Sequence, residues 1–325
     1  MTNSGNKIDL YSYMKIFSSK YRIHVISSIF IFLMIFTILF YSQVMDISIP
    51  FPDIQSDTSQ NLILTKKETI YIGIISRYPP EIIYKGYQPI MDYLNTTTEY
   101  HFELKLSNSY QETVEQLTNN EVAGAFLGTY LYIRAHEQFG VKCILIPLNE
   151  NLESVSSSAV IVKNGSGINF IKDLRGKKLA LPSSESFSGK WFTGYELQNN
   201  GLNIGDLDSI SYFDHHQTVI YQLLKNHFDV GVVKERIARE YEKKGIVIIK
   251  SSEKIPGPPF VVPKNDNQKI TSIIKNAFLK IDVRNPYYKE ILTGWDSEYS
   301  HGFVEASDDD FDNVRKILSL SKIPQ

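Results

Sequence analysis

A serine-rich segment at residues 182–189, Pro-Ser-Ser-Glu-Ser-Phe-Ser-Gly, places several hydroxyl groups at the predicted start of a helix. The apolar run at 178–181 predicts a strand before it, and residues 190–197 predict the helix after it. The first turn of a helix presents unpaired backbone N–H groups and the positive end of the helix dipole, so serine hydroxyls there add donors to a region that already attracts anions. The segment indicates either an anion-binding turn or an ordinary serine cap on a surface helix.

Two adjacent histidines, His215 and His216, also have side chains that could do chemistry. A metal site is one alternative. However, neighbouring residues on a strand or loop point in different directions, and no cysteine, third histidine or carboxylate stands at a ligand interval. A single histidine in a cleft suits an oxyanion, because a bound dianion favours the imidazolium and gains a charge-assisted hydrogen bond. The sequence therefore predicts no metal and no other cofactor.

Enzyme motifs are absent from the sequence. It contains no Gly-x-Ser-x-Gly elbow, no Gly-x-x-x-x-Gly-Lys-Ser phosphate loop and no His-Glu-x-x-His zinc motif, and the single cysteine, Cys143, predicts a buried thiol. The 34 basic and 36 acidic residues give a formal net charge of -2, and the basic residues are scattered, which gives no general attraction to nucleic acid. We expect neither an enzyme nor a nucleic-acid-binding protein.

The scaffold for these residues is an alternation of predicted strands and helices from residue 69 onward, typical of the strand–helix–strand units of parallel sheets. A first set has strands at 69–76, 101–106, 122–127 and 143–147, with helices at 87–94, 109–119 and 131–139. A second set has strands at 159–162, 178–181, 229–233 and 246–249, with helices at 190–199, 218–225 and 235–244, followed by a strand at 260–262. Residues 266–320 are mostly helical in pattern.

Two such sets predict an α/β fold of two lobes with a ligand cleft between them. We predict lobe 1 at residues 69–155 and 258–325 and lobe 2 at 156–257. Ligand sites of open α/β sheets lie at the carboxyl ends of strands and at domain interfaces, which is where the serine-rich turn falls.

An uncharged apolar run at residues 25–41 is long enough, with its flanks, to cross the hydrocarbon core of a membrane as a helix. Four basic residues precede it and none follows until Lys66, so the positive-inside rule places the N-terminus in the cytoplasm. We expect a cytoplasmic N-terminus at 1–22, a single-pass transmembrane signal anchor at 23–41, a linker at 42–68 and an extracytoplasmic C-terminal domain, periplasmic or extracellular. A cleaved signal peptide is the competing interpretation, but no small-x-small cleavage site follows the run.

Short sequence marks recur in a characteristic order after residue 69. They are Gly-Ile-Ile-Ser at 73–76, Asn-Ser-Tyr at 108–110, Ala-Phe-Leu-Gly-Thr-Tyr at 125–130, Asp-Leu-Arg-Gly-Lys at 173–177, Glu-Ser-Phe-Ser-Gly at 185–189, His216, Asp-Val-Gly at 229–231, Ile-Pro-Gly-Pro-Pro at 255–259 and Asp-Phe-Asp-Asn-Val at 310–314. In this order the chain resembles the periplasmic substrate-binding proteins of phosphate, phosphite and phosphonate ABC transporters, the PhnD-like proteins with the type II periplasmic-binding-protein fold. The resemblance implies two sheets flanked by helices, a small anionic ligand bound between the lobes, and an ABC permease as partner.

The serine turn is the part of the resemblance that implies direct ligand contacts. By analogy with the family, Ser186 and Ser188 donate from their hydroxyls to the phosphoryl or phosphonyl oxygens, beside the backbone N–H groups of Phe187, Ser188 and Gly189. Several donors converging on three or four charged oxygens is what a tetrahedral oxyanion needs.

Four further residues complete the expected ligand-binding set. The positions that match the family's ligand-binding tyrosine and histidine are Tyr110 and His216. Thr129 and Tyr130 follow a predicted strand end in lobe 1 and are expected to close over the ligand from the other side, although a plain turn explains them nearly as well. For Tyr110, the alternative is a half-buried core tyrosine.

Departures from the family pattern bear on the ligand. Pro258 stands where family members that take aminophosphonates have an acidic residue, Ser156 replaces an aromatic, and Phe187 replaces the threonine of the serine turn. Glu235 lies one residue from where a second acidic ligand would stand. These changes leave phosphate, phosphite, a simple alkylphosphonate or another small anion. A membrane-tethered sensor domain and a degenerate scaffold without ligand are the alternative functions.

Overall fold

The computed structural model describes residues 19–44 and 67–320 of the chain. The chain divides into two units, Met1–Leu64 and Thr65–Gln325, and each is described by itself. The predicted cytoplasmic N-terminus and the predicted linker lie mostly outside the described residues.

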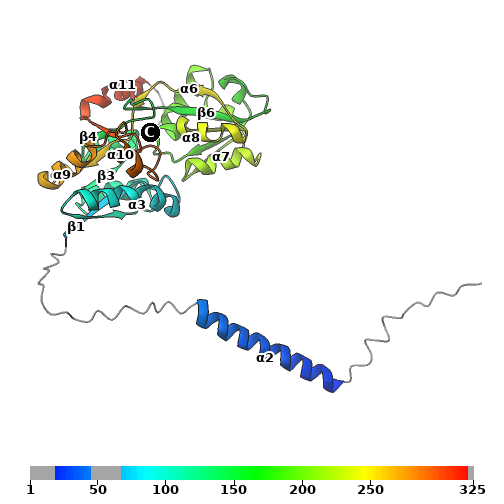
Figure 1. The fold of residues 1–325 in the computed structure, drawn as a ribbon. Helices are drawn as coiled ribbons and strands as arrows, with labels where there is room; N and C mark the ends of the chain where they lie inside the picture. The colour runs from blue at the N-terminus through cyan, green and yellow to red at the C-terminus, as the bar shows by residue number, and fades with distance from the viewer. Residues whose placement is uncertain (1–18, 45–66, 321–325) are drawn as a thin grey trace, which may run out of the picture. The chain divides into compact units, whose positions relative to one another are not determined.

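The first unit contains one described helix, α2 (Ser19–Val44, 26 residues), drawn in blue in Figure 1. The described side chains of this helix, residues 24–40, are all exposed to solvent. For α2, the structure describes side chains only at residues 24–40. Among the residues that the structure describes, no helix is long and apolar enough to cross a membrane. The transmembrane anchor at 23–41 therefore stays a prediction.

Lobe 1 of the second unit is built on a six-stranded mixed sheet with the order β13-β4-β12-β3-β1-β2. β1 pairs in parallel with β2 and β3, whereas β12 and β13 run antiparallel to β4. Its strands are β1 (Thr69–Ile74), β2 (His101–Lys105), β3 (Gly124–Phe126), β4 (Lys142–Pro147), β12 (Phe260–Val262) and β13 (Phe303–Glu305). Its helices are α3 (Pro80–Thr97), α4 (Tyr110–Thr118), α5 (Thr129–Phe139), α9 (Gln268–Leu279), α10 (Pro286–Ile291) and α11 (Asp312–Leu320), with the short 3-10 helix η5 (Asp308–Phe311).

Lobe 2 is built on a five-stranded sheet with the order β10-β6-β9-β7-β8. Its strands are β6 (Ser158–Lys163), β7 (Lys178–Pro182), β8 (Ser209–Phe213), β9 (Val230–Lys234) and β10 (Ile246–Ser251). Its helices are α6 (Thr193–Asn199), α7 (His216–Leu224) and α8 (Glu235–Glu240), with the 3-10 helices η1 (Ile171–Leu174), η3 (Ile204–Asp206) and η4 (Glu242–Lys244) and the π-helix η2 (Phe187–Phe192).

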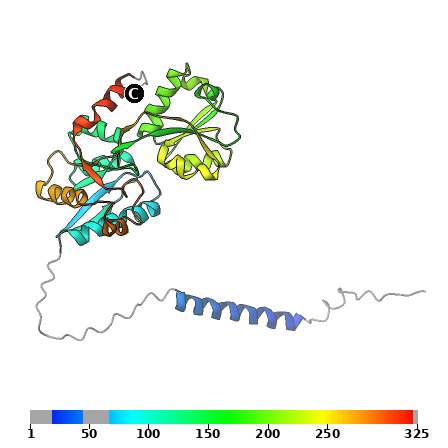
Figure 2. The same ribbon diagram turned by 45° about the horizontal axis from the view of Figure 1, so that its top comes forward.

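The two lobes are joined by a small two-stranded sheet. β5 (Val155–Ser156) leads into lobe 2 and β11 (Ile255–Pro256) leads back to lobe 1, and the two pair antiparallel. Figure 2 shows the two lobes side by side, one coloured mainly cyan and orange and the other green and yellow. The predicted lobe boundaries fall beside these crossing strands and remain a prediction at the level of single residues.

An aromatic cluster fixes the strand ends of lobe 1. The ring of Phe126, at the end of β3, lies 4.9 Å from Phe260, 4.6 Å from Tyr299 and 5.7 Å from Tyr87, measured between centroids. All four side chains are essentially inaccessible to water. Such pairs contribute about 0.5–1.5 kcal/mol each beyond their burial, so the last residues of β3 have little freedom to move.

The predicted alternation of strands and helices is confirmed, with several differences, among them α3, which is longer than the helix expected at 87–94, and the unpredicted strands β5 and β11. The edge strand β8 and the short strand β13 were not expected, because a partly polar edge strand and a three-residue strand carry little periodic signal. The helix expected from residue 190 begins earlier, as the π-helix η2 at Phe187. π-helical turns are often found at functional sites.

Candidate functional site

A small cavity of about 40 Å³ lies between the two lobes, at the edge where the strands of both sheets end. Eight of its seventeen lining residues carry a hydroxyl group. The lining residues are Ile75, Arg77, Tyr110, Gly128, Thr129, Tyr130, Leu131, Ser156, Ser157, Ser158, Glu185, Ser186, Phe187, Ser188, His216, Lys234 and Ile255. Seven of the eight residues expected from the sequence are among them, and Gly189 is the exception.

Strand order brings the lobe 2 residues together. β7 is parallel to β9, so their carboxyl ends meet at one edge, and β6 is antiparallel to β9, so its first residue lies there too. In the strand register, Ser158 at the start of β6 therefore stands opposite Lys234 at the end of β9. The serine turn follows β7, and His216 begins α7 shortly after β8. These are the positions at which α/β sheets generally bind ligands.

The serine turn is held by its own hydrogen bonds. Ser186 caps η2, because its Oγ accepts from the backbone N–H of Gly189 at 2.9 Å. That N–H is consequently satisfied within the turn. A Cβ on Gly189 would lie 2.4 Å from the carbonyl oxygen of Ser183, so the turn requires glycine at this position. The sequence left a helix cap and an anion-binding turn as alternatives. The two roles are compatible, because Ser186 caps η2 and also lines the cavity.

Ser188 is the most deeply placed hydroxyl of the turn, with 3% of its surface exposed. Its Oγ lies 2.6 Å from the Oγ of Ser158, and its carbonyl oxygen accepts from the hydroxyl of Thr193 at 2.9 Å. Since either hydroxyl of the first pair can donate, one proton of the pair is free to point into the cavity. The contact orients both serines toward the same point.

Three helices begin at residues that line the cavity. Tyr110 is the first residue of α4, Thr129 of α5 and His216 of α7. Their N-terminal ends place three positive dipole ends around one small volume, which favours an anion. The hydroxyl of Thr129 donates to the carbonyl oxygen of Pro256 at 2.9 Å, so this side chain ties lobe 1 to the crossing strand β11. Burial raises the pKa of Tyr110, which keeps its hydroxyl protonated as a donor.

Two cationic side chains line the cavity that were not expected from the sequence. Arg77 follows β1 and is 1% exposed. It forms ion pairs with Glu298 and, at 3.4 Å, with Asp296, and it donates to the hydroxyl of Tyr87. Its Nε is buried without a hydrogen-bond partner among the described residues. A buried guanidinium with one donor unused is poised for an additional acceptor.

The second cation, Lys234, ends β9 and pairs with Glu298, which also pairs with Arg77. Because Lys234 belongs to lobe 2 and Glu298 to lobe 1, this carboxylate joins the lobes. A neighbouring contact does the same, since Arg236 donates to the hydroxyl of Tyr78 at 2.9 Å. Burial and the guanidinium groups nearby lower the pKa of Lys234. The structure therefore holds the lobes together through two cations, Arg77 and Lys234, that are already paired with the carboxylates of Glu298 and Asp296.

His216 lines the cavity, and its surroundings determine the charge of its imidazole. The side chain is 2% exposed, and its Nδ1 accepts the backbone N–H of Lys234 at 3.3 Å. Burial, followed by the charges of Lys234 and Arg77, holds the pKa of His216 well below its usual value. The imidazole is therefore neutral with its proton on Nε2, and it can donate a hydrogen bond without being an imidazolium. The expectation that a bound dianion favours the imidazolium stays a prediction.

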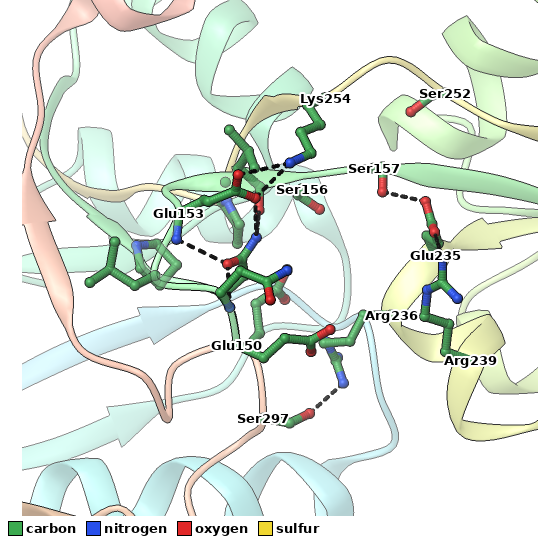
Figure 3. Close-up of a pocket in the computed structure, with 18 residues that line it drawn as sticks. Glu150, Glu153, Ser156, Ser157, Glu235, Arg236, Arg239, Ser252, Lys254 and Ser297 are labelled. Carbon is green, nitrogen blue, oxygen red and sulfur yellow. Dashed lines mark hydrogen bonds and ion pairs between the residues drawn. The ribbon is translucent and has the colours of Figure 1, made fainter. Parts of the chain in front are cut away.

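A larger pocket of about 370 Å³ adjoins the cavity, and Figure 3 shows its polar lining. Ser156 and Ser157 line both spaces, and Glu235 accepts a hydrogen bond from Ser157 at 2.6 Å. Pro258 lines this pocket and offers no charge or donor. Carboxylates from other positions are also present, such as Glu153, which pairs with Lys254 in the same view. The exclusion of an aminophosphonate consequently rests on one position and stays a prediction.

No group of three or more His, Cys, Asp or Glu side chains is placed to hold a metal ion in the parts of the chain that the structure describes. Cys143 is buried with 7% of its surface exposed, as predicted, and burial raises the pKa of its thiol.

Solved structures similar to this chain share its fold. A binding protein component of an ABC phosphonate transporter from Pseudomonas aeruginosa matches with a TM-score of 0.71 and 17% identity, over 79% of this chain and 87% of that chain. PhnD1 from Prochlorococcus marinus, in complex with methylphosphonate, matches with a TM-score of 0.69 and 16% identity, over 79% and 99%. The aliphatic sulphonate binding protein SsuA from Escherichia coli matches with a TM-score of 0.53 and 13% identity, over 78% and 86%.

The sequence itself identifies the family. Residues 72–311 match the family described as the periplasmic substrate-binding protein of the phosphonate ABC transporter. The match begins in β1 and ends in η5, so it includes both lobes and every residue that lines the cavity. The chain therefore belongs to the family of periplasmic substrate-binding proteins of phosphonate ABC transporters.

Proposed function

We propose that the protein binds one small phosphorus oxyanion, phosphate, phosphite or a simple phosphonate, and delivers it to an ABC importer. The observation that carries the proposal is the cavity between the lobes, where hydroxyl donors, three helix N-termini and two cations surround about 40 Å³. Such a volume accommodates a few water molecules or one small anion, and hydrogen-bond donors and cations that converge on so small a space favour a compact oxyanion.

The proposed contacts come from both lobes. In lobe 2, Ser186, Ser188 and the backbone N–H groups of Phe187 and Ser188 donate to the oxygens, with the N–H of Gly189 kept for the turn itself. The charge on the anion is balanced by two cations, one from each lobe, and further donors close the site. The cations are Arg77 and Lys234 and the further donors are Tyr110, Tyr130 and His216, whereas the hydroxyl of Thr129 lines the cavity and already donates to Pro256.

The competing carboxylate is part of the proposed cycle. Glu298 pairs with Arg77 and Lys234 in the structure, so the lobes are joined by an internal anion. An incoming oxyanion would share these cations with Glu298, and hinge motion at β5 and β11 would open and close the site. Closure around the ligand then presents one surface of the paired lobes to the permease.

Calorimetric titration of the full-length chain in a maltoside detergent tests the proposal. The panel is phosphate, phosphite and methylphosphonate, with sulfate as an oxyanion of similar size and chloride as a control for ionic strength. We expect one-site binding of at least one phosphorus oxyanion and at least about tenfold weaker binding of sulfate, a difference of about 1.4 kcal/mol. No heat from any phosphorus oxyanion at millimolar concentration refutes the proposal.

We also propose that α2 anchors the protein in the membrane with the binding domain outside the cytoplasm. The helix has 26 residues, about 39 Å at the usual rise, against a hydrocarbon core of about 30 Å. Residues such as Ile26, Phe30 and Phe32 expose more than half of their apolar surface. In cells, the proposal predicts that the protein resists alkaline extraction from membranes and that its C-terminal domain is digested by protease added from outside the cytoplasm. Release by alkali contradicts it.

A further inference from the structure

A second pocket, of about 470 Å³, lies on the outer side of the serine turn, between α6, the end of β10 and α11. It is lined by Phe187, Trp191, Phe192, Tyr195, Glu196 and neighbouring polar residues. Phe187 and Ile255 line both this pocket and the oxyanion cavity, so their side chains form a shared wall. Nothing in the proposed oxyanion function uses this second pocket.

The aromatic lining of the pocket follows from the sequence spacing. Phe187, Trp191 and Tyr195 recur at every fourth position through η2 and α6, which places their side chains along one side of the helical segment. The indole N–H of Trp191 is buried without a hydrogen-bond partner among the described residues. The ring of Trp191 also packs edge-on against Tyr130, with centroids 5.8 Å apart, which fixes its orientation.

A carboxylate on a largely buried side chain faces the same space. Glu196 lines the pocket with only 7% of its surface exposed, and in the described part of the chain its carboxylate takes part in no hydrogen bond and no ion pair. Burial raises the pKa of Glu196, whereas the positive charge of Lys250, an exposed residue on the pocket rim, lowers it. A carboxylate that faces a pocket from a largely buried side chain and has no partner in the described part of the chain can accept a cation from outside.

We infer that this pocket binds a small organic ammonium ion, whose charge meets the Glu196 carboxylate while its apolar groups lie against Trp191 and Tyr195. Aromatic faces attract ammonium groups, and the attraction grows when water is excluded. A neutral ligand would leave the carboxylate unpaired, and an anion would be repelled by it. The ligand therefore belongs to the class of alkylammonium compounds.

Choline and its uncharged carbon analogue, 3,3-dimethylbutan-1-ol, form a matched pair of probes for the full-length chain. We expect choline to bind saturably at millimolar or lower concentration and the alcohol to bind about five- to thirtyfold more weakly, the range of a desolvated cation–π and ion contact. Binding should change the fluorescence of Trp191, one of only two tryptophans, and the change should be lost in Trp191→Phe. Equal affinities for the two probes, or no saturable binding of choline, overturns the inference.

Variants separate this site from the oxyanion cavity and from occupants within the chain. Glu196→Gln should remove the preference for choline while methylphosphonate binding persists, and Lys250→Gln should strengthen choline binding by removing a competing charge. Circular dichroism checks that Glu196→Gln is folded. If it is not folded, Glu196→Asp replaces it as the test, and this variant should keep the preference for choline because it keeps the carboxylate. If wild type fails to bind choline and Lys322→Gln binds it, the occupant is the chain's own C-terminal lysine and the inference is wrong.

Discussion

Removal of the charge on Lys234 is expected to weaken oxyanion binding strongly. In Lys234→Met, the side chain keeps its length and apolar stem but loses the ammonium group that lines the cavity. Glu298 keeps its other ion pair, with Arg77, so the variant leaves no buried carboxylate without a partner. We therefore expect the fold to persist and the loss to appear mainly in ligand affinity.

The magnitude follows from the type of contact. A hydrogen bond to a charged group contributes about 1.5–3 kcal/mol net, which corresponds to about a tenfold to 150-fold rise in the Kd for methylphosphonate. Lys234 is 17% exposed, so solvent screens this contact only slightly. In the wild-type protein, the ligand shares the ammonium group of Lys234 with Glu298, so its own contact is weaker than an unshared one. We therefore expect the rise in Kd to lie in the lower half of the tenfold to 150-fold range.

Isothermal titration calorimetry of methylphosphonate measures the change, and Lys178→Met is the matched control. Lys178 is an exposed lysine at the start of β7, while the serine turn follows the end of that strand, about 13 Å away. This distance exceeds the screening length of about 8–10 Å at physiological salt, so the control should bind within about twofold of wild type. A folded Lys234→Met protein with wild-type affinity refutes the placement of the anion beside this lysine.

Three further changes have distinct expected outcomes. Glu298→Gln removes the carboxylate that competes with the ligand for Arg77 and Lys234. The affinity for methylphosphonate should therefore rise several-fold, while the thermal midpoint of the ligand-free protein falls. An unchanged affinity would show that the carboxylate does not compete. Gly189→Ala places a Cβ 2.5 Å from the carbonyl oxygen of Pro182 and 2.4 Å from that of Ser183, so both the midpoint and binding should drop, and wild-type titrations would contradict the rigid turn. His216 has a lowered pKa, so as the pH falls below 6.5 its imidazole gains a proton in the unfolded chain but not in the folded chain, and the thermal midpoint should fall. His216→Gln should lose this part of the dependence of the midpoint on pH. An identical pH dependence in the variant would show that this imidazole does not titrate as expected.

Residues at the carboxyl ends of predicted strands were the ones that sequence patterns could place in the cavity. Tyr110, Thr129 and Tyr130 follow strands of lobe 1, and His216 follows β8, although that strand itself was not predicted. Strand ends gather at one edge in α/β folds, which favours the meeting of these positions, but Tyr110 and His216 were singled out by the resemblance to the family.

The two cations of the site were missed, although the sequence carried a signal for both positions. Lys234 directly follows a buried strand and Arg77 follows β1 by three residues, so the same strand-end rule would have found both. Glu298, in contrast, reaches the site from a loop after α10, and only the folded chain shows that it pairs with both. The lowered pKa of His216 depends first on its burial and then on these cations, and only the folded chain shows both.

An electron-density map of the chain crystallised with saturating methylphosphonate tests the central claim most directly. We predict a phosphorus peak in the cavity between the lobes, with phosphonate oxygens about 2.6–3.0 Å from the Oγ of Ser188 and the Nζ of Lys234. A cavity without ligand density at saturation, or methylphosphonate bound away from the serine turn, would contradict the account.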